Sequence, residues 1–237
     1  MKTQFSRRKF IQSGGLLLAT PILANPLEVM TKLKTLNMDD QHFEVIIVGG
    51  SYAGLSAGMA LGRSLRKTLI IDSGKPCNRS TPHAHNFITH DGESPAAISS
   101  KAKAQVLEYP TVKFVDAKVV AISNGDRFEV TTDQNETYTA RKVLFATGVK
   151  DTMSAIQGFA QCWGISILHC PYCHGYEVSG KNTGIIANGD TAYDLCTLIQ
   201  HWTDQLTLFT NGSATISPEQ RQSIEQLGIR IIEDEIE

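Results

Sequence analysis

The sequence predicts an α/β protein built on parallel strands, with a glycine-rich turn after the first of them. Residues 44–48 form a continuous apolar run, as in strands that are buried on both faces. This run leads into Gly49-Gly50-Ser51-Tyr52-Ala53-Gly54, and residues 55–65 follow with helical spacing. A second apolar run, residues 68–71, ends at Asp72. The order of strand, tight turn, helix, strand and acid predicts a Rossmann-like dinucleotide-binding unit.

The turn and the acid have separate expected roles toward a nucleotide. Backbone amides at the start of the helix would hold a pyrophosphate, and Asp72 would accept hydrogen bonds from ribose hydroxyls. Ser51 stands where the usual fingerprint has its middle glycine; serine allows close backbone approach but fits less freely. An ordinary βαβ unit without a ligand is the alternative. The expected cofactor-binding residues of this unit are Gly49, Gly50, Ser51, Ala53, Gly54 and Asp72.

Composition is that of an ordinary globular protein. The 237 residues suffice for one large domain or two small ones, and 41% apolar with 19% charged residues leaves enough for a sizeable core. A net charge of −2 gives no electrostatic reason to expect a nucleic acid or an acidic membrane surface as partner. Five cysteines, an odd number, argue against a fully paired disulfide scaffold.

Residues 1–25 have the pattern of an export signal. A basic head precedes a short apolar run, residues 14–24, which is too short to span a bilayer comfortably. Ser6-Arg7-Arg8-Lys9-Phe10-Ile11 resembles the twin-arginine signal, so we expect a periplasmic or other extracytoplasmic location, with a cytoplasmic protein as the alternative. Residues 26–41 are expected to form a linker.

The strongest chemical signal is His169-Cys170-Pro171-Tyr172-Cys173-His174-Gly175. Two cysteines separated by two residues can close and reopen a disulfide, and this spacing tends to lower the pKa of one thiol. A histidine on each side offers a proton acceptor near neutral pH. A metal site and an inert pair of thiols are the alternatives; zinc usually needs a second pair of ligands, which the sequence lacks. The expected catalytic residues are Cys170, Cys173, His174 and His169, with no metal.

Three motifs in order carry a family resemblance. Residues 48–58 resemble the FAD-binding start of the thioredoxin reductase-like flavoproteins (class II pyridine nucleotide-disulfide oxidoreductases), and Leu144-Phe145-Ala146-Thr147-Gly148 resembles their second flavin-domain landmark. The cysteine pair stands where that family carries its redox disulfide. The resemblance implies an FAD domain with three layers (ββα) and a second, partial nucleotide-binding domain. It also adds Asn86, Thr147 and Gly148 as expected cofactor contacts.

The resemblance divides the chain into two parts. Residues 42–157 would be the N-terminal part of the FAD-binding domain, with a helix at 95–107 and a small antiparallel layer of four strands. These four strands are expected at residues 112–115, 118–123, 128–132 and 136–140. Residues 158–237 would be a partial NAD(P)-type domain that carries the cysteine pair.

The second domain departs from the family where NAD(P)H would bind. A strand at 182–186, a turn and a helix at 192–201 are expected, but Ala187 replaces the first glycine of the turn. Thr210-Asn211-Gly212, after the next strand, offers neither an arginine for a 2′-phosphate nor an acid for a ribose. Use of NAD(P)H is therefore left open. The family's return segment is missing, so we expect either a fragment or a truncated gene product.

The residues around the cysteines select a function within the family. Cys170 to Glu177 differ from the thioredoxin reductase pattern and are closer to the gliotoxin-type dithiol oxidases. This resemblance implies that Cys170 takes the substrate thiol, that Cys173 faces FAD, and that oxygen reoxidises the flavin. The alternatives are an NAD(P)H-dependent, thioredoxin-disulfide reductase-like enzyme and a truncated non-catalytic remnant. The expected partner is a small-molecule dithiol or a thioredoxin-like protein, without nucleic acid or a stable membrane span; a homodimer is left open.

Overall fold

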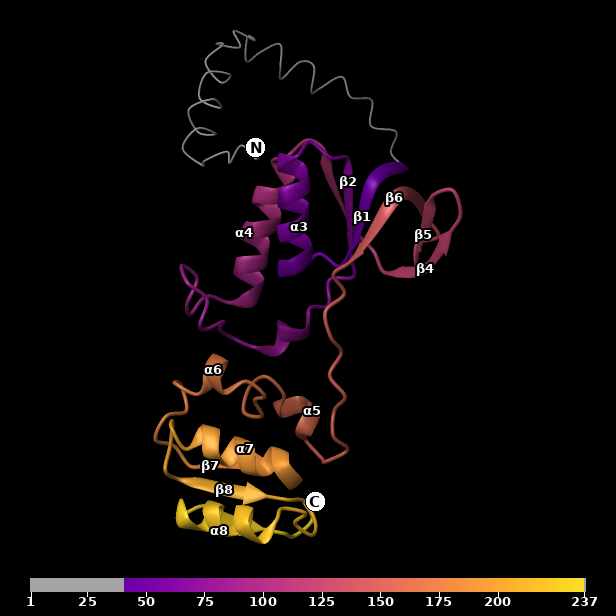
Figure 1. Ribbon diagram of the computed structural model, residues 1–237. Helices are drawn as coiled ribbons and strands as arrows, with labels where there is room; N and C mark the ends of the chain where they lie inside the picture. The colour runs from indigo at the N-terminus through magenta and orange to yellow at the C-terminus, as the bar shows by residue number, and fades with distance from the viewer. Residues whose placement is uncertain (1–40, 237) are drawn as a thin grey trace, which may run out of the picture. The chain divides into compact units, whose positions relative to one another are not determined.

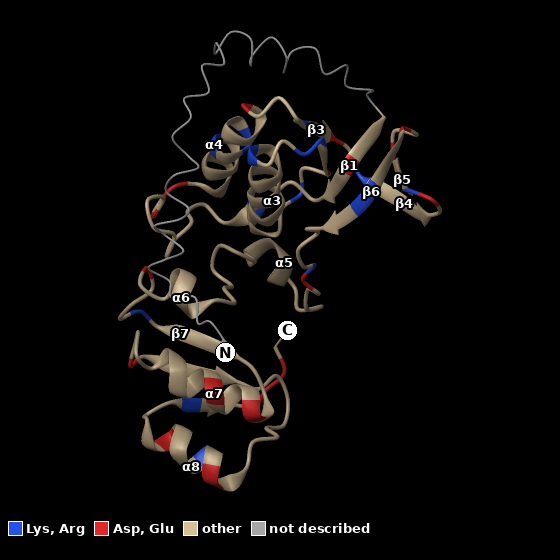
Figure 2. Ribbon diagram, turned by 45° about the horizontal axis from the view of Figure 1, so that its top comes forward, with Lys and Arg blue, Asp and Glu red and all other residues tan. Residues whose placement is uncertain are grey.

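The computed structural model describes residues 41–236 (Figure 1). The expected export signal, residues 1–25, and all of the expected linker except residue 41 lie outside the described residues. Within residues 41–236, none of the helices is long and apolar enough to cross a membrane. Basic and acidic residues are interspersed along this part of the chain, as on the C-terminal helix at residues 218–226 (Figure 2).

The first sheet begins with three parallel strands. β1 (His42–Val48) pairs with β2 (Thr68–Asp72), and β2 pairs with β3 (Val112–Asp116), all in parallel. Helix α3 (Tyr52–Arg63) connects the first two strands, and α4 (Pro95–Leu107) precedes β3 after the short helix η1 (Cys77–Ser80). The predicted strand–turn–helix–strand order is confirmed, although α3 begins three residues earlier than expected.

The sheet continues with three antiparallel strands, in the order β3-β2-β1-β6-β5-β4. β4 (Val119–Asn124), β5 (Phe128–Thr132) and β6 (Thr137–Phe145) pair in sequence. The prediction that residues 112–115 belong to the antiparallel layer is wrong, because β3 lies beside β2 in parallel. Helix α4 makes the crossover that a parallel strand requires. The expected strand at 136–140 is the first part of the longer β6, which also includes residues 144–145 of the second landmark.

Alternate side chains of the parallel strands pack against different layers. Ile47 and Ile70 pack with Leu55 of α3 and Val106 of α4. Ile46 and its neighbours on the opposite face pack with side chains of β5 and β6, among them Val130, Tyr138 and Ala140. Helices therefore cover one face and antiparallel strands the other, which confirms the expected three-layer ββα arrangement.

A second, smaller parallel sheet follows in the C-terminal part of the described chain. Its strands are ordered β7-β8-β9 and have the bounds β7 (Thr183–Ile186), β8 (Leu206–Phe209) and β9 (Arg230–Ile232). Helices α7 (Gly189–Ile199) and α8 (Pro218–Gln226) bury Cys196 and Ile224 against Leu208 of β8. Ser217 closes a capping box at the start of α8. Between the two sheets lie the short helices α5 (Phe159–Cys162) and α6 (Pro171–His174).

Candidate redox site

The turn after β1 requires glycine at the positions that the sequence singled out. Gly49 has a φ of +106°, and a Cβ there would overlap the carbonyl oxygen of Ala146. A Cβ on Gly54 would overlap the carbonyl oxygen of Gly49, and one on Gly50 would lie 2.7 Å from the ring of Phe114. The close packing of this turn therefore excludes any larger residue. Ser51 is tolerated because its φ is −87°.

The carboxylate of Asp72 links this turn to the end of β2 through hydrogen bonds. The amide of Gly50 donates to Oδ1 of Asp72 at 2.9 Å, and the amide of Gly74 donates to Oδ2 at 3.0 Å. Each carboxylate oxygen can accept a second hydrogen bond, so the side chain keeps capacity for a ribose hydroxyl. Asp72 thus has a structural role that the sequence pattern did not predict, beside the role expected toward the cofactor.

The start of α3 suits a phosphate group. Ser51, its N-cap, makes no side-chain cap hydrogen bond, and the first turn, which contains Ala53, holds no acidic residue. By contrast, Ser94, Asn188 and Ser217 cap the other described helices of more than eight residues. Free amides at a helix N-terminus bind anions through hydrogen bonds and the helix dipole. These residues therefore fit the pyrophosphate of FAD.

The second flavin-domain landmark lies beside the glycine turn. The amide of Ala146 donates to the carbonyl oxygen of Val48 at 2.8 Å, which brings the end of β6 next to the end of β1. Thr147 and Gly148 continue from there, and Gly148 has a φ of +65° with open space where a Cβ would be. The motifs at 49–54 and 144–148, distant in sequence, thus meet at one edge of the sheet.

Cys170 and Cys173 form a disulfide, with their Cα atoms 5.3 Å apart. Cys170 is the N-cap of α6, and Pro171 occupies the first turn, where a missing amide is tolerated. Gly175 ends this short helix in close contact with Trp202, since a Cβ on Gly175 would lie 2.7 Å from the indole Nε1. The segment that carries the disulfide therefore packs closely against Trp202, which follows α7.

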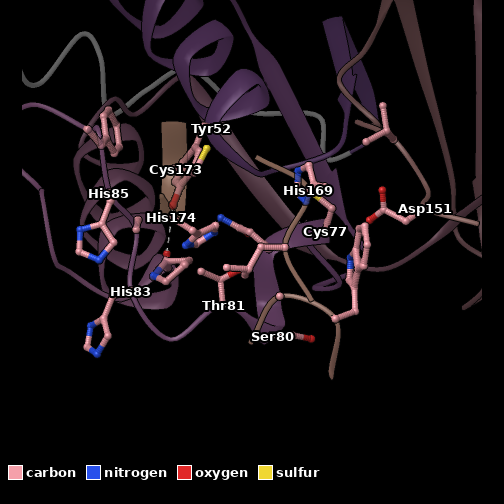
Figure 3. A pocket seen from close by; sticks show the side chains of 18 residues that line it. Tyr52, Cys77, Ser80, Thr81, His83, His85, Asp151, His169, Cys173 and His174 are labelled. Carbon is pink, nitrogen blue, oxygen red and sulfur yellow. Dashed lines mark hydrogen bonds between the residues drawn. The ribbon is translucent and has the colours of Figure 1, made fainter. Parts of the chain in front are cut away.

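Cys173 lines a cavity of ≈ 350 Å³ together with Tyr52 of α3 (Figure 3). The loop that follows β2 contributes much of the wall, including Thr81 and Phe87. Four histidines also line this cavity: His83, His85, His169 and His174. Asn86 does not line it: its side chain is exposed, and its amide donates to Asp91 Oδ1 at 2.8 Å.

Cys170 lines a different and larger cavity of ≈ 620 Å³. Apolar side chains from α5, β7 and α7 form part of its wall, among them Phe159, Ile185 and Leu195. Four residues line both cavities and so form the wall between them: Trp163, Leu168, His169 and His174. The disulfide and its two flanking histidines thus lie where the cavities meet.

The two histidines have different environments. Burial lowers the pKa of His174 below its usual value, and the carboxylate of Glu177 partly opposes this effect. A neutral imidazole can accept a proton. His169 is exposed and stacks on Trp163, with ring centroids 5.3 Å apart and planes 14° apart. Trp163 stacks in turn on Phe159 at 5.7 Å.

Several cavity residues were not expected as functional residues. Tyr52 and Trp163 have no sequence signal beyond their aromatic character, and Cys77 lines the same cavity as Cys173. Cys77, Cys162 and Cys196 are free thiols. In residues 41–236 there is no group of three histidine, cysteine or acidic side chains placed to hold a metal ion.

At the turn before α7, a side chain of the protein already makes the hydrogen bonds that a bound anion would need. Asn188 Oδ1 accepts hydrogen bonds from the amides of Gly189 at 2.9 Å and Thr215 at 2.7 Å. Asp190 places a carboxylate in the first turn of α7. An anion at this helix start would compete with Asn188 and be repelled by Asp190. These residues do not fit the pyrophosphate of NAD(P)H in the way that the start of α3 fits that of FAD.

The chain is similar to known proteins along most of its described length. Residues 43–235 match the model of the pyridine nucleotide-disulphide oxidoreductase family. The chain is 32% identical over 185 residues to thioredoxin reductase tcpT of Claviceps purpurea, covering 74% of this chain and 58% of that protein. It is 35% identical over 195 residues to thioredoxin reductase aclD of Aspergillus oryzae, covering 78% of this chain and 62% of that protein.

A solved structure of a similar protein has the same fold. An oxidoreductase from Agrobacterium tumefaciens superimposes with a TM-score of 0.77 at 36% identity, covering 81% of this chain and 65% of the other. The chain thus spans about three fifths of the length of the two curated relatives. The family match covers most of its residues, and the chain belongs to the pyridine nucleotide-disulphide oxidoreductase family.

Proposed function

We propose that the protein is an FAD-dependent thiol/disulfide oxidoreductase that oxidises dithiols through Cys170 and Cys173, with oxygen as the final acceptor. One observation carries the proposal: Cys170 lines one cavity and Cys173 the other, while a disulfide joins them. A thiol that enters on one side can thereby deliver electrons to the other side.

The residues of the chain carry out the following steps. His174 or His169 accepts the proton of a substrate thiol in the larger cavity, and the thiolate attacks the sulfur of Cys170. The disulfide breaks, and Cys173 leaves as a thiolate that faces the smaller cavity. The second substrate thiol loses its proton and attacks the substrate sulfur bonded to Cys170. The bond between that sulfur and Cys170 breaks, Cys170 leaves as a thiolate that takes up the proton, and the substrate is released as a disulfide. The cysteine pair gains the two electrons that the substrate loses.

Residues of both flavin-domain motifs, the second at Thr147 and Gly148, would hold the cofactor. The helix start at Ser51 and Ala53 would bind the pyrophosphate, and Asp72 the ribose. Tyr52 and the loop after β2 line the cavity that Cys173 enters. FAD, when bound, supplies the two-electron acceptor that restores the Cys170–Cys173 disulfide, with oxygen as the acceptor after it. Overall, one dithiol and one oxygen molecule give one disulfide and one hydrogen peroxide.

The turn before α7 favours an enzyme that passes its electrons to oxygen over one that takes electrons from NAD(P)H. Asn188 caps the helix start where a pyrophosphate would bind, and Asp190 places a negative charge in the same turn. Export, proposed from the twin-arginine-like pattern in residues 1–25, would also remove the protein from the cytoplasmic NADPH supply. Both considerations leave molecular oxygen as the accessible acceptor. The substrate would be a small-molecule dithiol or a thioredoxin-like protein.

An NAD(P)H-dependent disulfide reductase is the second candidate, because tcpT and aclD are both named as thioredoxin reductases. Anaerobic spectroscopy separates the two. The protein loaded with FAD should lose its flavin absorbance on addition of dithiothreitol and keep it on addition of NADPH. Bleaching by NADPH alone would favour the reductase. A protein that takes up no FAD would instead indicate a non-catalytic remnant.

A further inference from the structure

His85 connects the loop after β2 to the segment that follows the disulfide. Its Nδ1 lies 3.7 Å from Oδ2 of Asp91 in the same loop, and its Nε2 lies 3.4 Å from Oε1 of Glu177. The side chain of His85 is only 23% exposed, whereas those of Asp91 and Glu177 are 67% and 39% exposed. A half-buried imidazole between two carboxylates is thus shared by two segments that are distant in sequence.

The backbone of Glu177 lies close to the redox pair and makes contacts within the same segment. It lies four residues after Cys173, and the intervening Gly175 packs against Trp202. The carbonyl oxygen of Glu177 also accepts a hydrogen bond from Lys181 Nζ at 2.8 Å. His85, Cys173 and His174 line one cavity (Figure 3), so the imidazole of the ion pair lies at the cavity into which Cys173 would be released.

We propose that His85 and Glu177 are positioning residues for His174: their ion pair holds the segment after Cys173 against the loop after β2 and sets the charge around the proton acceptor. This inference rests on the proposed function for its role in catalysis. It concerns contacts within the chain itself, however, and can be tested without flavin.

The charges around His174 give the ion pair a testable signature. Burial lowers the pKa of His174, Glu177 raises it, and His85 and His169 lower it. The groups that face His85 are Asp91, Glu177, His174 and the ring of His83, whose centroid is 6.5 Å away. When protonated, His85 neutralises Glu177 and repels a second positive charge on His174. Removing Glu177 should therefore lower the pKa of His174, and removing His85 should raise it.

The test is a titration of the His174 C2 proton by NMR in the oxidised, flavin-free chain, with the signal assigned by its loss in His174→Gln. In Glu177→Gln the midpoint should fall by about 0.5 pH unit, and in His85→Gln it should rise by a similar amount. The acid limb of the pH profile for reduction of the disulfide by dithiothreitol should move in the same direction in each variant.

The control is His201→Gln, which replaces an exposed histidine just after α7 and should leave the midpoint unchanged. The double variant, His85→Gln with Glu177→Gln, should give a midpoint between those of the single variants. It replaces both members of the pair and so gives a result even if one single variant does not fold. Shifts of the same sign in both single variants, or no shift in either, would overturn the inference. Opposite shifts in a protein without dithiol oxidase activity would leave the inference standing and refute the proposed function.

Discussion

Cys170 and Cys173 share a disulfide, yet Cys170 lines only the larger cavity and Cys173 only the smaller one. This arrangement gives electron transfer through the pair a direction, because the cysteine that is attacked and the cysteine that is released line different cavities. His169 and His174 line both cavities, so a proton acceptor is available on either side. The following predictions depend on this arrangement and on the turn that prepares the flavin site.

The pH dependence of dithiol oxidation should reflect His174. Burial lowers its pKa, so the neutral, proton-accepting imidazole persists below the usual histidine pKa and is lost only at still lower pH. In rapid-mixing measurements of disulfide reduction by dithiothreitol, the rate should fall on the acid side with a midpoint below 6.5. His174→Gln should lower the rate by about 10²-fold and remove this midpoint. An unchanged acid limb in that variant would assign the limb to another group.

The free thiols should differ in reactivity. Burial raises the pKa of Cys196 to about 11, whereas Cys77 is exposed. Iodoacetamide at pH 8 should therefore modify Cys77 within minutes and leave Cys196 intact, as measured by peptide mass spectrometry. In guanidinium chloride both thiols should react. Labelling of native Cys196 at the rate of Cys77 would contradict the buried environment described for it.

Alanine at Gly54 should disrupt the flavin turn. Its Cβ would overlap the carbonyl oxygen of Gly49, so the turn would have to move, at a cost of about 1–3 kcal/mol. We expect a lower unfolding midpoint in urea and loss of bound FAD. Gly180→Ala is the matched control, because a Cβ there meets nothing within 4 Å and only the φ of +70° opposes it. That variant should lose about 1 kcal/mol. Equal effects of the two substitutions would contradict this account of the turn.

Asn188 should stabilise the second unit without serving a dinucleotide. Asn188→Ala removes the cap of α7 and the hydrogen bonds to Thr215, with an expected loss of about 1–3 kcal/mol in urea unfolding. Ser217→Ala, which removes the cap of α8, should lose about 1 kcal/mol as a comparison. Isothermal titration of the parent chain with NADPH should give no binding in the micromolar range. Micromolar affinity would show that the capped turn opens for the nucleotide.

Much of the fold could be predicted from the sequence because its signals are local. The apolar run at 44–48, the glycine turn and Asp72 form a pattern within 29 residues, and the structure has it in the predicted order. The capping box at Ser217 is likewise a short-range signal. The placement of β3 was missed because a five-residue strand does not itself reveal its partner. Helix α4, which precedes β3, was the available clue, because parallel strands need a crossover connection that is usually a helix.

The candidate site could be predicted only in part, because only some of its residues are close together in the sequence. The cysteine pair and its histidines are adjacent in sequence, but Trp163, Tyr52 and His85 reach the cavities through long-range packing that no local pattern encodes. Glu177 is the last residue of the stretch that the sequence singles out, but its pairing with His85 depends on the fold. The expected contact of Asn86 with the cofactor, which the family resemblance implies, stays a prediction; its side chain lies outside the cavity that its neighbours line.

The most direct test of the account is oxygen uptake by the FAD-loaded chain with dithiothreitol as substrate. Cys173→Ser should abolish uptake, with a loss of at least about 10³-fold, because the sulfur that faces the smaller cavity is gone. Cys162→Ser, a free cysteine that lines neither cavity, should leave uptake unchanged. Uptake in Cys173→Ser at the rate of the parent protein would contradict the claim that electrons pass through the disulfide.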